Sequence, residues 1–85
     1  MHESIDIEIY SRPGCHLCDE AKAVIEPFMQ QYRLQLKVTN VDSDARLRET
    51  YGWDIPVILL NGAEAFRHRV DAVAFERKLQ ELWNP

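Results

Sequence analysis

The sequence has 85 residues, of which 46% are hydrophobic and 28% are charged, and its formal net charge is −4. This composition is typical of a soluble globular protein, and the length suits one domain, so we expect residues 1–85 to form a single folded unit. No basic run or stripe is present, which argues against a nucleic-acid partner. No apolar stretch reaches the roughly 18 residues that a membrane span requires.

The first residues carry neither a basic segment nor an apolar segment of the kind found in secretory signals, so we expect a cytoplasmic location. The chain contains two cysteines, Cys15 and Cys18. In the cytoplasm a lone cysteine pair indicates a catalytic or metal-binding role rather than a structural disulfide.

The first third of the chain predicts a strand, a loop and a helix. Residues 5–10 alternate isoleucine with more polar side chains, and this period of two predicts a strand with one lightly covered face. The Pro-Gly pair in residues 11–14 predicts a loop. From Cys15 onward, apolar side chains recur at helical spacing as far as Phe28. Pro27 removes one intrahelical hydrogen bond, so we expect the helix to kink or to end there.

The middle of the chain predicts two strands separated by a short helix. Residues 34–41 alternate in polarity again and predict the second strand. Ser43 is the expected N-cap of a helix that runs to Tyr51, with Gly52 in the left-handed conformation after its last turn. Residues 57–60 form a short continuous apolar run, which is typical of a strand buried on both faces.

The last third predicts a hairpin and a closing helix. Asn61-Gly62 is a strong two-residue hairpin signal, so we expect residues 63–69 to return as an antiparallel fourth strand. Asp71 is the expected N-cap of the final helix.

Val70 and Phe75, on either side of that cap, suit a hydrophobic staple. The element order is therefore β-α-β-α-β-β-α. This order predicts an α/β protein of the thioredoxin-like fold, in which a four-stranded mixed sheet carries helices one and three on one face and helix two on the other.

Cys15-His16-Leu17-Cys18 is the most informative motif. A Cys-x-x-Cys beside a β-α-β pattern is the signal for a thioredoxin-like redox site. We expect Cys15 at or just before the first helical turn, where free backbone N–H groups and the helix dipole lower a thiol pKa from about 8.5 to about 3.5–7.5. Cys15 is then the attacking nucleophile, and Cys18, one turn along and facing inward, is the resolving thiol. Glu8 is a weak candidate for a proton acceptor near Cys18, and a surface carboxylate is the simpler interpretation.

Two segments carry a family resemblance. Residues 9–18, Ile-Tyr-Ser-Arg-Pro-Gly-Cys-His-Leu-Cys, resemble the active-site strand and loop of glutaredoxins. Residues 54–57, Asp-Ile-Pro-Val, followed by an apolar strand and Asn61-Gly62, resemble the second signature of glutaredoxins and thioredoxins. The resemblance covers essentially the whole chain and is closest to small glutaredoxin-like proteins of the thioredoxin superfamily. It implies dithiol–disulfide exchange without a bound cofactor.

The chain departs from glutaredoxins at the positions that concern the substrate. His16-Leu17 stands where they carry Pro-Tyr, and residues 66–71 lack the Gly-Gly pair that holds the γ-glutamyl end of glutathione, although Asp71 stands in for the nearby acid. We therefore expect the partner to be a disulfide-containing protein or a small thiol, and the missing pair makes glutathione doubtful.

The resemblance also implies roles around the cysteines. Pro56 corresponds to the family's cis-proline, which leaves the backbone N–H and C=O of Ile55 free to pair with an extended substrate. Arg12 is either a solvated loop charge or an anchor for a substrate carboxylate. His16 is either an exposed loop histidine or a group that stabilises the thiolate. Trp53 and Tyr51 are expected near the cis-proline loop, where core or ledge packing is a more ordinary role than ligand stacking.

Two other classes of function stay open from the sequence. One is a non-catalytic thioredoxin-fold binding module with a redox-sensitive cysteine pair, and the other is a metal or iron–sulfur carrier. A zinc site needs about four ligands, and only His2, His16, His68 and carboxylates are available to complete one, none at suitable spacing. We therefore expect no metal site. We also expect the protein to be a monomer.

Overall fold

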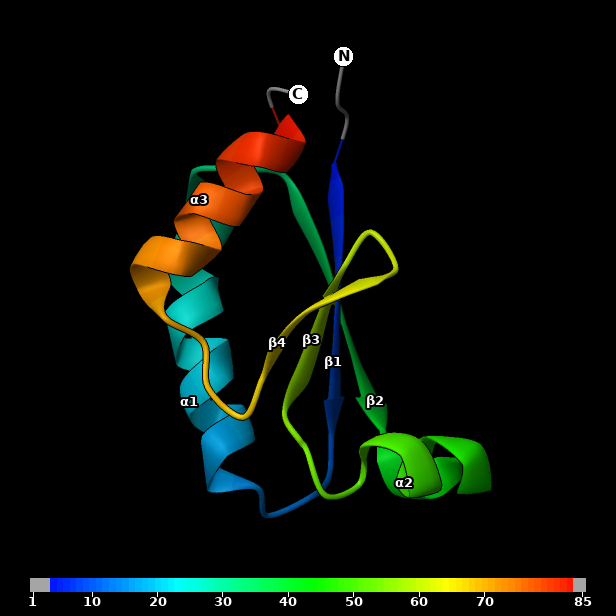
Figure 1. Ribbon diagram of the computed structural model, residues 1–85. Coiled ribbons are helices and arrows are strands. Elements are labelled where there is room, and N and C mark those ends of the chain that lie inside the picture. The colour runs from blue at the N-terminus through cyan, green and yellow to red at the C-terminus, as the bar shows by residue number, and fades with distance from the viewer. Residues whose placement is uncertain (1–3, 84–85) are drawn as a thin grey trace.

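The computed structural model describes residues 4–83, which form a four-stranded sheet with helices on its two sides (Figure 1). The strands lie in the order β2-β1-β3-β4, with β1 parallel to β2 and antiparallel to β3, and with β3 antiparallel to β4. The strands are β1 (Ile5–Ser11), β2 (Leu34–Asn40), β3 (Val57–Leu60) and β4 (Ala63–Arg67). The helices are α1 (His16–Ile25), α2 (Ala45–Tyr51) and α3 (Ala72–Trp83). The predicted order of elements and the mixed sheet are confirmed.

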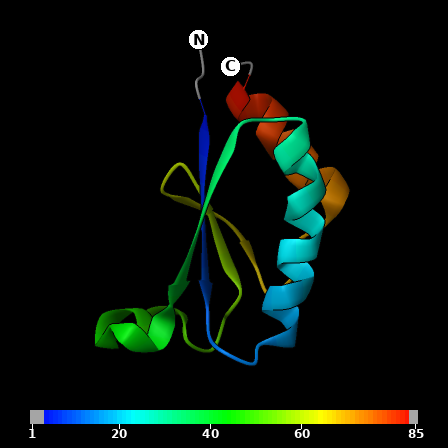
Figure 2. The same cartoon turned by 180° about the vertical axis from the view of Figure 1, so that it is seen from behind.

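The hydrophobic core lies between one sheet face and helices α1 and α3, which both pack on that face (Figures 1 and 2). The isoleucines of β1 supply the sheet side of the core, because alternate side chains of a strand point to the same face. Phe75 of α3 is fully buried, and its ring lies 5.4 Å from that of Phe28 and 6.1 Å from that of Phe66, measured between centroids. These packed rings fix α3 against the α1 side and against β4.

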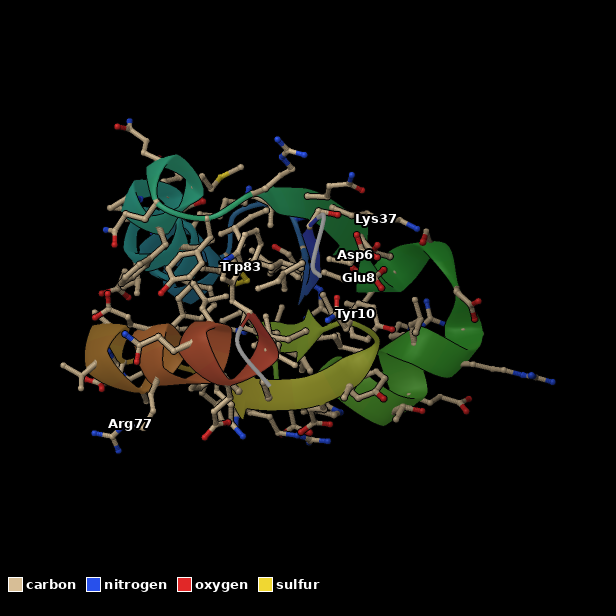
Figure 3. All side chains as sticks on the ribbon, turned by 90° about the horizontal axis from the view of Figure 1, so that it is seen from above. Asp6, Glu8, Tyr10, Lys37, Arg77 and Trp83 are labelled. Carbon is tan, nitrogen blue, oxygen red and sulfur yellow. A yellow bond between two sulfur atoms is a disulfide. The ribbon has the colours of Figure 1, made fainter. Side chains whose placement is uncertain are left out.

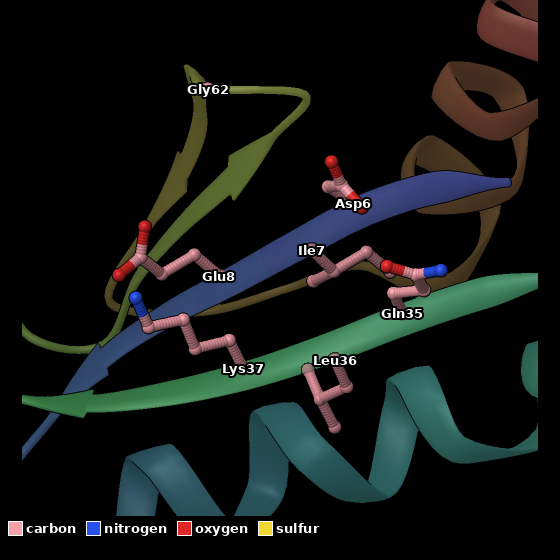
Figure 4. Close-up of a pocket in the computed structure, with 7 residues that line it drawn as sticks. All are labelled: Asp6, Ile7, Glu8, Gln35, Leu36, Lys37 and Gly62. Atoms are coloured by element: carbon pink, nitrogen blue, oxygen red, sulfur yellow. The ribbon is translucent and has the colours of Figure 1, made fainter.

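The opposite sheet face is only partly covered. Helix α2 lies on that side, at the end where β1 and β2 finish (Figure 2). Tyr10 points toward the same side (Figure 3), and its ring lies 4.8 Å from that of Tyr51 in α2, measured between centroids. Beyond α2 this face is polar, and Asp6, Glu8 and Lys37 line a hollow of about 430 Å³ (Figure 4). The prediction that one face of the first strand is lightly covered is therefore confirmed.

The first helix ends near Pro27 rather than continuing through it with a kink. The α-helix ends at Ile25, and the chain continues directly as a 3₁₀ turn over Glu26–Gln30 with Pro27 among its first residues. The amide of Glu26 still donates to the Lys22 carbonyl, but Pro27 has no N–H group with which to continue this series of hydrogen bonds. Pro27 thus ends the α-helix, but the chain remains helical for one further 3₁₀ segment.

The cap of α2 differs from the prediction. Asp44, not Ser43, is the N-cap, and its carboxylate accepts a hydrogen bond from the amide of Arg46 at 2.8 Å. The Ser43 hydroxyl is already used one turn earlier, where it donates to the Asn40 carbonyl at 2.6 Å. A 3₁₀ turn over Val41–Ser43 precedes the helix, so Ser43 bonds within that turn and Asp44 caps the helix.

Gly52 also differs from the prediction. Its φ is −55°, in the right-handed region rather than the left-handed one. The glycine is needed for space, because a Cβ at this position would lie 2.5 Å from the Arg48 carbonyl oxygen and 3.3 Å from the Arg12 guanidinium.

Strand β4 is shorter than predicted and ends at Arg67, because the chain turns at His68. His68 has a φ of +67°, and its amide donates to the Pro56 carbonyl at 2.8 Å. The predicted hairpin turn is confirmed, with φ values of 50° at Asn61 and 85° at Gly62.

The predicted cap of α3 is confirmed as well. The carboxylate of Asp71 accepts a hydrogen bond from the Ala74 amide at 2.9 Å. Val70 packs against the core that contains Phe75, as a hydrophobic staple requires.

Candidate functional site

Cys15 and Cys18 form a disulfide at the start of α1, with their Cα atoms 5.3 Å apart. Cys15 is the N-cap of the helix and has an extended backbone, with φ −83° and ψ 107°. Its sulfur accepts a hydrogen bond from the Cys18 amide at 3.1 Å. The sulfur of Cys15 therefore lies where the unpaired N–H groups of the first helical turn point.

The two cysteines differ in exposure. Cys18 faces the core and is 1% exposed, whereas Cys15 is partly exposed at the helix terminus. Of the two disulfide-bonded residues, Cys15 is therefore the more accessible from solvent. A partner molecule that approaches this end of the protein meets Cys15 first.

The loop that leads into β3 lies beside the cysteine loop. The Ile55–Pro56 peptide bond is cis, so this prediction is confirmed. Val57, the next residue, pairs with Tyr10 near the end of β1, and the cysteine loop leaves the sheet from that same end (Figure 1). Among residues 4–83, neither the amide nor the carbonyl of Ile55 has a hydrogen-bond partner.

Arg12 connects three segments around the site. Its guanidinium donates to both carboxylate oxygens of Asp42, at 2.8 and 2.9 Å, and to the Gly52 carbonyl at 3.3 Å. The hydrogen bond from Arg12 holds the pKa of the Asp42 carboxyl below its usual range. The sequence gives no sign of this contact, because the two residues are 30 positions apart. The guanidinium that was a candidate substrate anchor is thus engaged within the protein.

His16 is the first residue of α1 and is exposed next to Cys15. Glu8 does not lie near Cys18, so that suggestion was wrong. Glu8 is on the face of β1 opposite the isoleucines, and its carboxylate accepts a hydrogen bond from the Thr39 hydroxyl at 2.6 Å. The simpler interpretation of Glu8, a carboxylate outside the site, fits this position.

Asp54 and Trp53 precede the cis-proline and behave differently. The Asp54 carboxylate binds the Arg67 guanidinium at 2.5 Å and lies 3.5 Å from the His68 ring nitrogen. The Trp53 side chain is 93% exposed, so the expectation that it packs on the protein was wrong. Tyr51 is the aromatic residue of this segment that packs, between Tyr10 and the guanidinium of Arg67.

Residues 4–83 contain no group of three or more His, Cys, Asp or Glu side chains arranged to hold a metal ion. His2, one of the histidines considered for a metal site, lies outside the described residues. Over the same part of the chain, no helix has the length and apolar character needed to cross a membrane.

A cis-proline loop beside an N-capping Cys-x-x-Cys, on a β-α-β-α-β-β-α framework, defines a thioredoxin-superfamily protein with a candidate redox pair. Residues 6–80 match the family described as glutaredoxin-like domain (DUF836), and the chain belongs to this family. A curated relative is the "Glutaredoxin-like protein YDR286C homolog" of Dictyostelium discoideum, 29% identical over 75 residues that cover 81% of this chain and 69% of the relative.

Solved structures agree with the fold. Protein Ne2328 from Nitrosomonas europaea is similar with a TM-score of 0.80 and 25% identity, covering 92% of this chain and 94% of that one. Target protein XcR50 from X. campestris is similar with a TM-score of 0.74 and 25% identity, covering 88% and 96% of the two chains. A mutant thioredoxin from Halobacterium salinarum shares the fold alone, with a TM-score of 0.62 and 18% identity over 91% of this chain and 73% of the other.

Proposed function

We propose that this protein is a glutaredoxin-like thiol–disulfide oxidoreductase in which Cys15 attacks and Cys18 resolves. The observation that carries the proposal is the unequal exposure of a bonded pair at a helix N-terminus. Cys15 is partly exposed, and Cys18 is 1% exposed directly behind it. An attacking thiol must reach a bulky disulfide, whereas a resolving thiol needs to reach only its neighbour.

The proposed cycle starts from the dithiol form and balances at each step. The Cys15 thiolate attacks one sulfur of the substrate disulfide, and the other substrate sulfur leaves as a thiolate that takes a proton from water. Cys18 then loses its proton and attacks the Cys15 sulfur, which releases the second substrate sulfur. The substrate gains two electrons and two protons, and the protein is left with the Cys15–Cys18 disulfide.

The helix terminus supports the first step. The amide of Cys18 already lies 3.1 Å from the Cys15 sulfur in the disulfide form. In the dithiol form, this N–H group and the positive end of the α1 dipole favour the negatively charged thiolate over the thiol. His16 adds a positive charge beside the sulfur when its ring is protonated.

The cis-proline loop supports substrate binding. The unpaired amide and carbonyl of Ile55 suit an extended polypeptide that docks as an added strand against the loop before Pro56. The proposed substrate is a disulfide-containing protein or a small disulfide. Glutathione is the weaker candidate, because residues 66–71 contain no Gly-Gly pair.

The cycle uses no bound cofactor, since a separate dithiol or two monothiols return the pair to its reduced form. One chain contains both sulfurs, so a monomer is sufficient. The proposal places the protein in the cytoplasm, where reducing thiol systems are available.

Equilibration in glutathione buffers of graded ratio tests the redox couple. The thiols are trapped with an alkylating agent at each ratio and counted by mass. We expect both thiols to disappear together and reversibly, with a midpoint in the cytosolic range of about −220 to −320 mV. Thiols that stay reduced throughout, or a glutathione adduct on Cys15 as the sole oxidised product, would contradict the dithiol mechanism and favour a binding module, a metal carrier or a monothiol enzyme.

Single cysteine variants test the division of roles. Cys18→Ser is expected to accumulate a mixed disulfide on Cys15, because the resolving step is blocked, and Cys15→Ser is expected to accumulate none. Cys18→Ala serves as the matched variant, because a buried serine hydroxyl without a partner can itself destabilise the helix. An adduct that forms instead on Cys18 of the Cys15→Ser variant would reverse the assignment.

A further inference from the structure

Trp53 is a large apolar side chain placed almost entirely in solvent. Its exposed fraction is 93%, compared with 64% for Val73 and 45% for Val38, the next most exposed of the large hydrophobic residues described. Tryptophan buries more apolar area than any other side chain when it is covered, so its exposure in an isolated chain leaves a large favourable contact unmade.

The backbone that carries this indole is fixed on both sides. Gly52 before it donates its amide to the Arg48 carbonyl at 3.0 Å and accepts a hydrogen bond from Arg12. Asp54 after it donates its amide to the Tyr51 carbonyl at 2.8 Å and holds Arg67 through its carboxylate. A partner that covers the indole therefore has little loop entropy to overcome, which is the condition for a preorganised contact.

A hollow of about 340 Å³ lies beside Trp53, and the other residues that line it are Gly52, Glu49, Arg12 and Arg48. The two guanidinium groups differ in their partners. Arg12 is paired with Asp42, whereas Arg48 forms no salt bridge with any carboxylate among residues 4–83. The hollow thus places an uncovered indole next to an arginine that forms no salt bridge among the described residues, and the charge of Arg48 acts on the nearby Asp42 carboxylate only through space.

This surface adjoins the proposed site of chemistry. Trp53 is two residues before Ile55, whose amide and carbonyl are unpaired, and the same loop continues into the cis-proline. The Arg12 side chain links Gly52 to the loop that carries Cys15. An extended chain that lies along the Ile55 backbone therefore continues toward Trp53 and Arg48.

We propose that Trp53 and Arg48 form a specificity surface for a polypeptide substrate, on which an apolar side chain covers the indole and a carboxylate binds Arg48. This proposal rests on the proposed function, because the polypeptide is the one whose disulfide Cys15 attacks. Tryptophan and arginine are the side chains most enriched among those that dominate protein–protein binding. A small disulfide without side chains makes neither contact.

Three probes separate this surface from the chemistry. The first is bis(2-hydroxyethyl) disulfide, which has no side chains. The second is a disulfide-bonded peptide with a phenylalanine and a glutamate beside one cysteine, and the third is the same peptide with lysine in place of the glutamate. Steady-state kcat and KM are measured for the wild type, Trp53→Ala, Arg48→Gln and the control Val73→Ala, which removes an exposed apolar side chain on α3.

For Trp53→Ala we expect KM to rise about tenfold with both peptides and to stay unchanged with the small disulfide, since a contact of about 1.4 kcal/mol is lost. For Arg48→Gln we expect KM to rise about fivefold with the glutamate peptide alone. Val73→Ala is expected to match the wild type with all three probes.

Wild-type kinetics of Trp53→Ala and Arg48→Gln with both peptides would overturn the proposal. So would an equal loss by Trp53→Ala with all three probes, since that pattern indicates a role in the fold. A wild type that reduces none of the probes overturns the proposed function instead. The surface is then decided by titrating Trp53 fluorescence with the glutamate peptide made with serine at its cysteines, using Trp53→Ala to subtract the Trp83 signal: saturable quenching supports the surface, and no change overturns it.

Discussion

The guanidinium of Arg12 donates hydrogen bonds to both carboxylate oxygens of Asp42, at 2.8 and 2.9 Å, and so connects the cysteine loop to the segment that follows β2. Both side chains are more than one-third exposed, at 37% and 39%. An exposed pair of this kind adds little to overall stability. Its importance is positional, because the same guanidinium also binds the carbonyl of Gly52 in the loop before the cis-proline.

We expect Arg12 to act by holding these loops rather than by binding substrate. Arg12→Met and Asp42→Asn should then both lower kcat/KM for a disulfide substrate by a few-fold factor, and the loss should be larger for Arg12→Met, which also removes the hydrogen bond to the Gly52 carbonyl. A substrate anchor predicts the opposite pattern for an anionic disulfide such as glutathione disulfide. In that case Arg12→Met raises KM, and Asp42→Asn lowers KM because it frees the guanidinium.

The Arg12–Asp42 pair also predicts a dependence of stability on pH. The hydrogen bond from Arg12 lowers the pKa of Asp42 in the folded state, so the carboxylate stabilises the fold at every pH above its unfolded pKa of about 3.9. This contribution is lost as the pH falls through the lower, folded pKa. Urea unfolding should therefore show a constant difference between wild type and Asp42→Asn from pH 5 to pH 8, and a shrinking one below pH 4. A difference that grows on acidification would contradict the assignment.

The parts of the fold that the sequence predicts well are those set by local rules. The alternation in β1, the continuous apolar run of β3 and the cap at Asp71 each depend on a few neighbouring residues. The Asn61-Gly62 turn is of the same kind, because both residues adopt positive φ, as a tight hairpin requires. The cis bond before Pro56 is different. Only about 5–6% of X-Pro bonds in folded proteins are cis, so family resemblance, and not propensity, predicted it.

The features that the sequence did not predict depend on distant contacts. Asp42 becomes part of the site only because β2 ends beside the cysteine loop. Gly52 satisfies a steric limit set by Arg48 and Arg12 rather than a left-handed cap. Of the two aromatic residues near the cis-proline loop, Tyr51 packs against Tyr10, whereas Trp53 is exposed. Residue types and spacing do not determine which of two nearby aromatic residues packs.

The backbone conformation of His68 leads us to expect that glycine and valine at this position differ in their effect on stability. Its φ of +67° lies in the left-handed region, where a side chain costs about 1–2 kcal/mol relative to glycine. His68→Gly is expected to leave the free energy of unfolding unchanged or to raise it by up to about 1 kcal/mol, because relief at this position offsets the entropy of glycine in the unfolded chain. His68→Val should destabilise by about 1–2 kcal/mol. Equal stability of the two variants in urea unfolding would show that the turn does not hold residue 68 at positive φ.

Among single substitutions by alanine on α3, we expect the change at Phe75 to cause the largest loss of stability. It is fully buried and its ring packs against those of Phe28 and Phe66, so Phe75→Ala leaves a cavity among α3, β4 and the 3₁₀ turn that follows α1. We expect a loss of about 3–5 kcal/mol, which is a large part of the stability of a domain of this size. Val73→Ala, on the exposed side of the same helix, should change the free energy of unfolding by no more than about 0.5 kcal/mol. Comparable losses for the two variants would mean that α3 does not use the Phe75 face to close the core.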